Sequence, residues 1–288
     1  MTARVVFVGR AKQLAIAVLW IALFASVALA VGLVLHALTA GLGGPTWWLV
    51  RDGAVQVAAL FAATWLVGRR WSKRSWDQLG WHVGGGLAPR VLRGLGLGAS
   101  MAALAVGLAL VVGRATVRLT HDWSRWPVIA VPLFVGLLLA ALSEELLFRG
   151  FPLRRLADAI GPWAAMILLA TAFGLAHLKN PDATAFSTIN VALAGVWLSF
   201  AFFSPGGIGL AWGLHAGWNA GLALVFDAPV SGYPFSVPAV EYVPGRHAWV
   251  DGGAFGPEGG AVTTIVLVAG TLVVLGARLR RPTAWLAG

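Results

Sequence analysis

The chain has 288 residues, of which 59% are hydrophobic and only 11% are charged, and its mean hydropathy is +0.81. This composition lies outside the range of ordinary soluble domains and within that of polytopic membrane proteins. The formal charge is +10, but the basic residues form short clusters between apolar runs, which predicts topology signals and no nucleic-acid partner. The absence of cysteine excludes disulfides, thiol catalysis and cysteine-ligated zinc.

Eight apolar segments follow one another along the chain, each long enough to cross a lipid bilayer as a helix. They lie near residues 14–38, 47–68, 91–113, 127–150, 160–178, 184–203, 207–226 and 261–278. The sequence therefore predicts an all-α integral membrane bundle of about eight transmembrane helices, with residues 1–288 forming a single membrane domain. The Gly-rich stretch 94–100 suits a close helix contact, and the Pro- and Gly-rich stretch 228–260 is expected to be one long outer loop.

Basic residues are distributed unevenly over the connections between these segments. With the N-terminus inside, the inner connections hold fifteen of the 21 Lys and Arg residues, which predicts that both termini are cytoplasmic. The abundance of Ala, Gly and Arg relative to Lys is typical of a GC-rich bacterial genome, so we expect the bacterial cytoplasmic membrane. Among the fifteen are Arg149, Arg154, Arg155, Arg280 and Arg281.

Few ionisable residues lie well inside the apolar segments. Glu144 and Glu145 follow an uncharged run in the fourth segment, His177 lies in the fifth, and His215 lies in the seventh. Each such group costs roughly 2.5 to 3.5 kcal/mol near a helix centre on insertion scales, so lipid packing alone gives no reason for them. Counting 1.5 Å per residue from the inner boundaries brings Glu144 and the two histidines to a common level in the inner or middle part of the membrane.

Helical geometry separates the two glutamates. Glu145 and Arg149 are four residues apart, on one face and in the order that favours an ion pair, whereas Glu144 points in another direction. Glu144 continues a row that contains Gly136 and Ala140, whose small side chains allow another helix to approach. We therefore expect Glu145 to be neutralised by Arg149 and Glu144 to be available for chemistry.

The seventh segment presents a second polar pair, because His215 and Asn219 are also four residues apart. Phe173, one turn before His177, is expected to form an apolar wall beside that histidine. Together these positions predict that Glu144, His177, His215 and Asn219 converge in a polar cavity open toward the cytoplasmic side.

Three short motifs in this order resemble those of a known family. "EELLFR" (144–149), "FGLAH" (173–177) and "HAGWN" (215–219) are similar to the EExxxR, FxxxH and HxxxN motifs of the CAAX-protease and bacteriocin-processing (CPBP, or Abi) intramembrane endopeptidases, which include CAAX prenyl protease 2. Each motif is weak alone, but three in order on successive apolar segments are a strong signal. The resemblance covers the expected catalytic core, about 127–226, and "GGAFGPEGG" resembles outer-loop sequence of some bacterial members.

The resemblance implies hydrolysis of a peptide bond. Glu144 would act as general base on a water molecule that His177 holds and polarises. His215 and the amide of Asn219 would donate hydrogen bonds to the developing oxyanion.

The resemblance also implies supporting roles for Glu145, Arg149 and Phe173. Glu144, His177 and His215 would be the ligands if a zinc ion were present. Catalysis without a metal or other cofactor is preferred, because the helix-borne HExxH of zincins is absent and an Asn beside a His suits an oxyanion hole.

Other functions would use the same side chains. Taken singly, the glutamate pair is a solvated helix end and "HAGWN" is an interhelical hydrogen-bond pair. A proton-coupled transporter is expected to contain inverted repeats, and a non-catalytic scaffold or immunity protein is expected to lack a catalytic residue; the sequence shows neither feature. The expected substrate is a membrane-associated protein or peptide, and peptide maturation, bacteriocin self-protection and cleavage of a membrane-anchored regulator all stay open, as does the oligomeric state.

Overall fold

The computed structural model describes residues 3–279 apart from 43, 45–46, 82–85 and 121–122. The helices are α1 (Ala3–Thr39), α2 (Trp48–Ala63), α3 (Ala88–Val111), α4 (Trp126–Phe148), α5 (Phe151–Ile160), α6 (Pro162–Ala176), α7 (Ala185–Phe203), α8 (Gly207–Ala220), α9 (Ala248–Asp251) and α10 (Ala261–Leu279). Shorter elements are the π-helical turns η1 (Thr64–Trp71) and η2 (Gly221–Val225), the 3-10 turns η3 (Gly253–Phe255) and η4 (Pro257–Gly259), and the strands β1 (Thr116–Leu119) and β2 (Val240–Val243).

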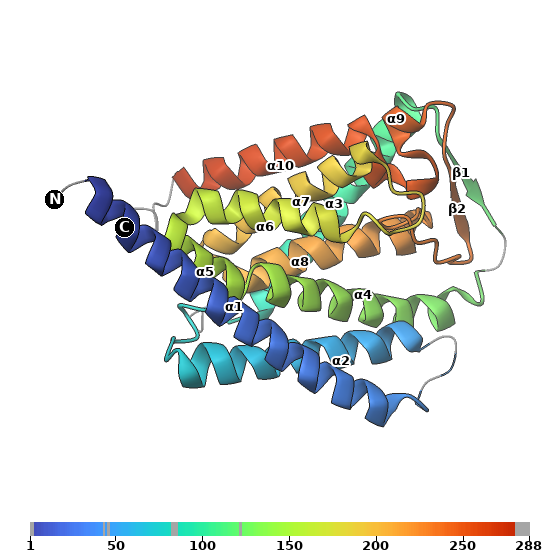
Figure 1. Cartoon of the computed structure of the whole chain (residues 1–288). Helices are drawn as coiled ribbons and strands as arrows, with labels where there is room; N and C mark the ends of the chain where they lie inside the picture. The colour runs from blue at the N-terminus through green and yellow to red at the C-terminus, as the bar shows by residue number, and fades with distance from the viewer. Residues whose placement is uncertain (1–2, 43, 45–46, 82–85, 121–122, 280–288) are drawn as a thin grey trace.

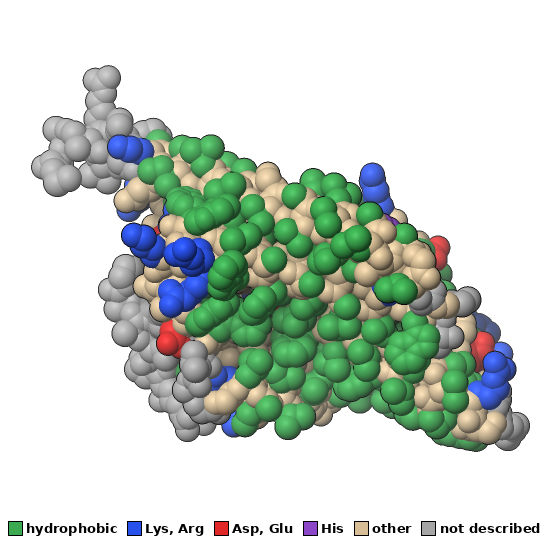
Figure 2. Space-filling model, turned by 90° about the horizontal axis from the view of Figure 1, so that it is seen from below, with side chains coloured by type: hydrophobic (Ala, Val, Ile, Leu, Met, Phe, Trp, Pro, Cys, Tyr) green, Lys and Arg blue, Asp and Glu red, His purple; other side chains and the backbone are tan. Residues whose placement is uncertain are grey.

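The predicted all-α membrane bundle is confirmed, and each of the eight predicted segments coincides with a helix. Within the described part of the chain, five helical segments are long and apolar enough to cross a membrane: Arg10–Thr39, Trp48–Trp71, Ala88–Val111, Trp126–Ile160 and Ala185–Phe203. The helices α6 and α10 are apolar but shorter, and α8 continues into η2. Apolar side chains cover the middle of the face in Figure 2, and most charged side chains on it lie near its two ends, as a lipid-facing surface requires.

The long helices alternate in direction, so the start of α1 and the end of α10 lie at one end of the bundle (Figure 1). The segment 226–260 lies at the other end and is more ordered than the single long loop that the sequence predicted. Its strand β2 pairs antiparallel with β1, which places Val243 opposite Thr116. Two 3-10 turns then lead into α10.

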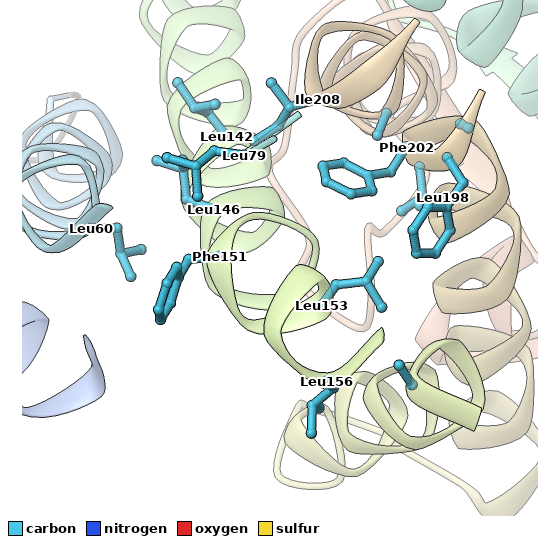
Figure 3. Packing of buried hydrophobic residues seen from close by; sticks show 14 of the residues in the cluster. Leu60, Leu79, Leu142, Leu146, Phe151, Leu153, Leu156, Leu198, Phe202 and Ile208 are labelled. Carbon is cyan, nitrogen blue, oxygen red and sulfur yellow. The ribbon is translucent and has the colours of Figure 1, made fainter. Parts of the chain in front are cut away.

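The fourth predicted segment is broken near its inner end. Gly150 leaves the helical conformation with ψ at −123°, and Pro152 lies in the first turn of the next helix, where its missing N–H is not needed. The new helix α5 buries Phe151, Leu153 and Leu156 against the neighbouring helices (Figure 3). The break therefore adds an amphipathic helix at the end of the bundle where α1 begins (Figure 1).

Two arginines counted as inner-connection charges are core residues. Arg149 and Arg154 are both buried, and the guanidinium of Arg154 lies 4.8 Å from the ring centre of Phe202. Neither acts as an exposed charge in a loop between membrane helices, because both side chains are buried inside the bundle. Arg280 and Arg281, which also entered the count, lie outside the described residues.

Helix α8, which carries the "HAGWN" motif, crosses α3 at very short range. A Cβ atom at Gly98 would lie 2.1 Å from the carbonyl oxygen of Leu214, and one at Gly213 would lie 2.3 Å from that of Val91. Backbone atoms cannot move aside without shifting a helix, so glycine is required at these positions. The prediction that the stretch 94–100 makes a close helix contact is confirmed.

Replacement of Gly98 by alanine tests this crossing. Gly98→Ala should destabilise the protein by about 1 to 3 kcal/mol, the usual cost of overpacking, because its methyl group collides with the backbone of α8. Gly96→Ala is the matched control, since a Cβ at Gly96 meets no atom within 4 Å. Thermal unfolding in detergent measures both variants, and a Gly98→Ala protein that melts like Gly96→Ala would contradict the crossing.

Candidate functional site

The paired glutamates of α4 occupy different surroundings. The Glu145 side chain is 0% exposed, whereas that of Glu144 is 33% exposed. Glu145 Oε1 accepts a hydrogen bond from Arg149 Nη1 at 3.1 Å, so the expected ion pair is present. The Arg149 guanidinium also lies 4.2 Å from the ring centre of Phe173 on α6, a cation–π arrangement. The charge of Glu145 is thus compensated inside the bundle.

Glu145 has a second partner that the sequence did not predict. Its Oε1 atom lies 2.9 Å from Nδ1 of His215 on α8. The other ring nitrogen, Nε2, lies 3.8 Å from Glu144 Oε2, so the imidazole contacts both glutamates at once. The prediction that Glu144 serves the chemistry and Glu145 only pairs with Arg149 is therefore incomplete. The two glutamates point 100° apart around α4, but the imidazole of His215 on α8 lies close to both.

His177 is oriented by the last turn of α6. It is the C-terminal capping residue of that helix, and its Nδ1 lies 2.7 Å from the carbonyl oxygen of Phe173. An N–H on Nδ1 donates to this carbonyl, which leaves the lone pair of the ring on Nε2. The Phe173 ring packs on His177 with a centre-to-centre distance of 4.7 Å, as expected, and lies 6.0 Å from the His215 ring.

Glu144 faces both imidazoles without touching either. Its Oε2 atom is 4.0 Å from His177 Nε2 and 3.8 Å from His215 Nε2. These distances are too long for hydrogen bonds, and this buried oxygen has no hydrogen-bond partner among the described residues. The three atoms therefore surround a point where a small group could bridge them.

Asn219 supplies the amide expected beside His215. It lies one turn further along α8 and lines the same cavity as both histidines. Its side chain forms no hydrogen bond with any other residue that the structure describes, so its N–H groups are available to a ligand. All four residues predicted for the site are thus brought together, although Glu144 is not among the residues that line the cavity.

The cavity has a volume of about 30 Å³, which is room for one or two water molecules. Its position differs from the expected one, because its wall includes residues of the segment 226–260, which lies at the end of the bundle opposite the start of α1 and the end of α10. The reason is that α6 ends at Ala176. His177, which follows it, therefore lines the cavity together with Ser231 and Glu258 of that segment. The lining residues are Phe173, His177, Asn190, Val191, Ala194, Trp197, Leu198, His215, Trp218, Asn219, Ser231, Glu258, Thr263 and Leu267.

Glu258 in η4 is a site residue that the sequence reading missed. Its carboxylate accepts hydrogen bonds from Trp218 Nε1 at 2.9 Å, from Ser231 Oγ at 3.1 Å and from the backbone N–H of Ser231. Burial raises the pKa of Glu258 above that of an ordinary glutamate, because desolvation penalises the charged form. The available signal was a single acidic residue in the Gly-rich stretch 252–260.

Comparison with known families agrees with the motifs. Residues 125–221 match the family described as Rce1-like, type II CAAX prenyl endopeptidase. This segment is Rce1-like. The Rce1-like segment contains all three motifs, so the resemblance to the CPBP family is confirmed, and it supports a CAAX-type intramembrane protease as the general class. No curated protein matches the chain.

The same atoms can be tested for fit to zinc. Zinc holds its ligands at about 2.0 to 2.2 Å, which sets neighbouring ligand atoms of a tetrahedral site about 3.4 Å apart. A water molecule that donates to two acceptors sets them about 4.4 Å apart. The observed 4.0 and 3.8 Å lie between these values, and no cluster of three ligands at metal spacing occurs among the described residues. Both histidines have Nδ1 engaged by another acceptor, as metal-binding histidines do, so the side chains suit either occupant.

The buried ion pair gives a test of stability. Glu145→Gln leaves the guanidinium of Arg149 without a carboxylate, and we expect a loss of about 3 to 5 kcal/mol. The double variant Glu145→Gln/Arg149→Met removes both charges and should recover most of that loss. Thermal unfolding in detergent compares the two, and a double variant that melts as low as the single one would show that the loss does not come from the unpaired guanidinium.

Proposed function

We propose that the chain is an intramembrane endopeptidase that hydrolyses peptide bonds of membrane-associated proteins or peptides with a water molecule activated by Glu144. The observation that carries this proposal is the convergence of Glu144 Oε2 on Nε2 of His177 and of His215, at 4.0 and 3.8 Å. The free amide of Asn219 beside them and the Rce1-like segment support it.

Water activation follows from the two acceptors. Because Nδ1 of His177 donates to the Phe173 carbonyl, its Nε2 accepts one proton of the water in a hydrogen bond. Glu144 accepts the other proton, which leaves a lone pair of the water oxygen free to attack the carbonyl carbon of the substrate. Glu144 then gives this proton to the amine nitrogen as the C–N bond breaks, so protons and charge balance.

Stabilisation of the oxyanion falls first to Asn219. Its amide is a neutral donor that needs no change of protonation, and it has no competing partner among the described residues. His215 already donates from Nδ1 to Glu145, so it can donate to the oxyanion from Nε2 only as an imidazolium. Such an imidazolium would stand between the carboxylates of Glu144 and Glu145.

The main prediction concerns Glu144. Glu144→Gln keeps the shape of the side chain but cannot accept a proton, so peptide cleavage in detergent or liposomes should fall by at least roughly 10² to 10⁴. Glu241→Gln makes the same change on the exposed strand β2 and should leave the rate unaltered. Near-normal cleavage by Glu144→Gln would remove Glu144 as the base, whereas no cleavage by the unaltered protein would favour the transporter or scaffold functions.

Asn219 gives a second, smaller effect. Asn219→Ala removes an oxyanion donor and should lower kcat by roughly 10² to 10³ while KM changes little, because the hydrogen bond strengthens in the transition state. Steady-state kinetics on one peptide substrate measure this division. A variant altered only in KM would assign Asn219 to substrate binding instead.

Zinc remains the alternative occupant, held by Glu144, His177 and His215. A bound zinc ion would supply a Lewis acid and lower the pKa of a bound water. We prefer the metal-free site because the Asn219 amide is free and the sequence lacks HExxH. Cleavage that persists after dialysis against a chelator is expected, whereas loss with chelator and recovery with zinc would establish the metal enzyme.

We further propose that the protein lies in the bacterial cytoplasmic membrane as one domain with both termini inside. The excess of Lys and Arg in the connections predicted to be on the inner side supports this orientation, because the start of α1 and the end of α10 lie at one end of the bundle. Reporter fusions after residue 288 should be active in the cytoplasm, and insertions next to the exposed Arg246 should be active outside. A C-terminal reporter active outside would reverse the topology.

A further inference from the structure

Glu258 is a carboxylate that the proposed hydrolysis does not use. It lies in η4, outside the membrane-spanning helices, yet it lines the same cavity as His177, His215 and Asn219. A glutamate in a Gly-rich outer segment would ordinarily point into water. This one is turned inward, toward the histidines.

The position of this carboxylate is fixed on two sides. Asn190 of α7 donates through Nδ2 to the backbone carbonyl oxygens of Glu258 at 2.8 Å and Gly260 at 2.9 Å. Its Oδ1 accepts from Thr264 Oγ1 of α10 at 2.7 Å. The turn that carries Glu258 is therefore tied to two helices, and the carboxylate is pre-organised before any ligand arrives.

The charge of Glu258 has no cation to balance it. Its hydrogen-bond donors, Trp218 and Ser231, are neutral, and it forms no ion pair with a Lys or Arg of the described chain. The buried Arg149 is already paired with Glu145, and Glu144 adds another carboxylate beside the histidines. A half-buried carboxylate without a counter-charge is unfavourable, so a cationic group of a ligand would be stabilised here.

We propose that Glu258 is a specificity-determining residue that binds a positively charged nitrogen of the substrate next to the bond that is cut. This inference rests on the proposed function. The nitrogen could belong to a free α-amino group or to a lysine side chain, and the cavity of about 30 Å³ suits a compact ammonium better than a guanidinium. A free C-terminal carboxylate, in contrast, would meet the acidic side chains Glu144, Glu145 and Glu258.

The rest of the cavity wall suits the end of a lysine side chain. Val191, Ala194, Leu198 and Leu267 line it with apolar surface, and its volume of about 30 Å³ admits an ammonium group with the methylene group next to it, while the remainder of the side chain would lie outside. A polar group at one point and apolar surface elsewhere is the usual composition of a site that orients one side chain.

The test measures binding, so that it does not depend on cleavage. The Glu144→Gln protein in detergent is titrated with fluorescent apolar peptides of about 20 residues that differ at one central position, which is lysine, acetyl-lysine or methionine. We expect the lysine peptide to bind roughly 10 to 100 times more tightly than the other two, the range for a hydrogen bond to a charged group. Glu144→Gln/Glu258→Gln should bind all three alike.

Two arms separate the possible sources and a merely structural role. A methionine peptide with a free amino terminus, compared with its acetylated form, shows whether an α-amino group is the cation that Glu258 binds. Thr264→Val on the Glu144→Gln background loosens the hold of Asn190 on the turn without changing charge, and it should weaken all peptides equally and keep the preference. Equal binding of charged and neutral peptides, or a preference for the charged peptide that survives Glu258→Gln, would overturn the inference. Selective binding of the charged peptide together with no cleavage by the unaltered protein would instead refute the proposed function.

Discussion

The site depends on the buried carboxylate of Glu145, whose two hydrogen bonds join α4 to α8 and hold the Arg149 guanidinium that contacts α6. One oxygen of Glu145 accepts from Arg149 at 3.1 Å and meets His215 Nδ1 at 2.9 Å. The guanidinium of Arg149 in turn covers the ring of Phe173, whose backbone carbonyl orients His177. The two imidazoles are therefore oriented, His215 directly and His177 through Arg149 and Phe173, by a group that has no contact with solvent. Both partners bind Oε1, while Oε2 has no hydrogen-bond partner among the described residues, so this buried charge depends on Arg149 and His215.

The helix packing places these side chains at one level. Glycines at the crossing of α3 and α8 let the "HAGWN" helix sit deep in the bundle, where Gly98 meets the backbone of Leu214. The start of α7 is fixed by a capping box, in which Thr184 and Ser187 exchange hydrogen bonds between side chain and backbone. That helix then supplies Asn190, which holds the turn of Glu258 over the cavity. Polar contacts thus hold the site residues in position, while the glycines allow α3 and α8 to approach each other closely.

The four central site residues follow from sequence, because spacing of four on a helix and a shared depth are local properties. The contact between Glu145 and His215 does not, since it depends on the rotation of α4 relative to α8, which neither segment encodes alone. The sequence predicts that the row of small residues on α4 allows another helix to approach, but it does not say which helix. In the structure this helix is α2, because a Cβ atom at Gly136 would lie 2.7 Å from Leu49. Glu258 was missed for a related reason, because the partners that turn it inward, Ser231 and Trp218, are 27 and 40 residues away in the chain. Spacing within one helix can be predicted from the sequence, whereas the helix or turn against which it packs depends on the tertiary structure.

The placement of Glu144 bears on how a substrate would approach. A third of the Glu144 side chain is exposed, and Glu144 is not among the residues that line the cavity, whereas Glu258 is. The cavity has room for an ammonium group but not for a peptide chain, because its volume is about 30 Å³. The bond to be cut would therefore lie outside the cavity, next to Glu144 and the two imidazoles, while Glu258 would meet only a small cationic group that enters the cavity. This division explains how a site can contain three glutamates without bringing all of them to the same point.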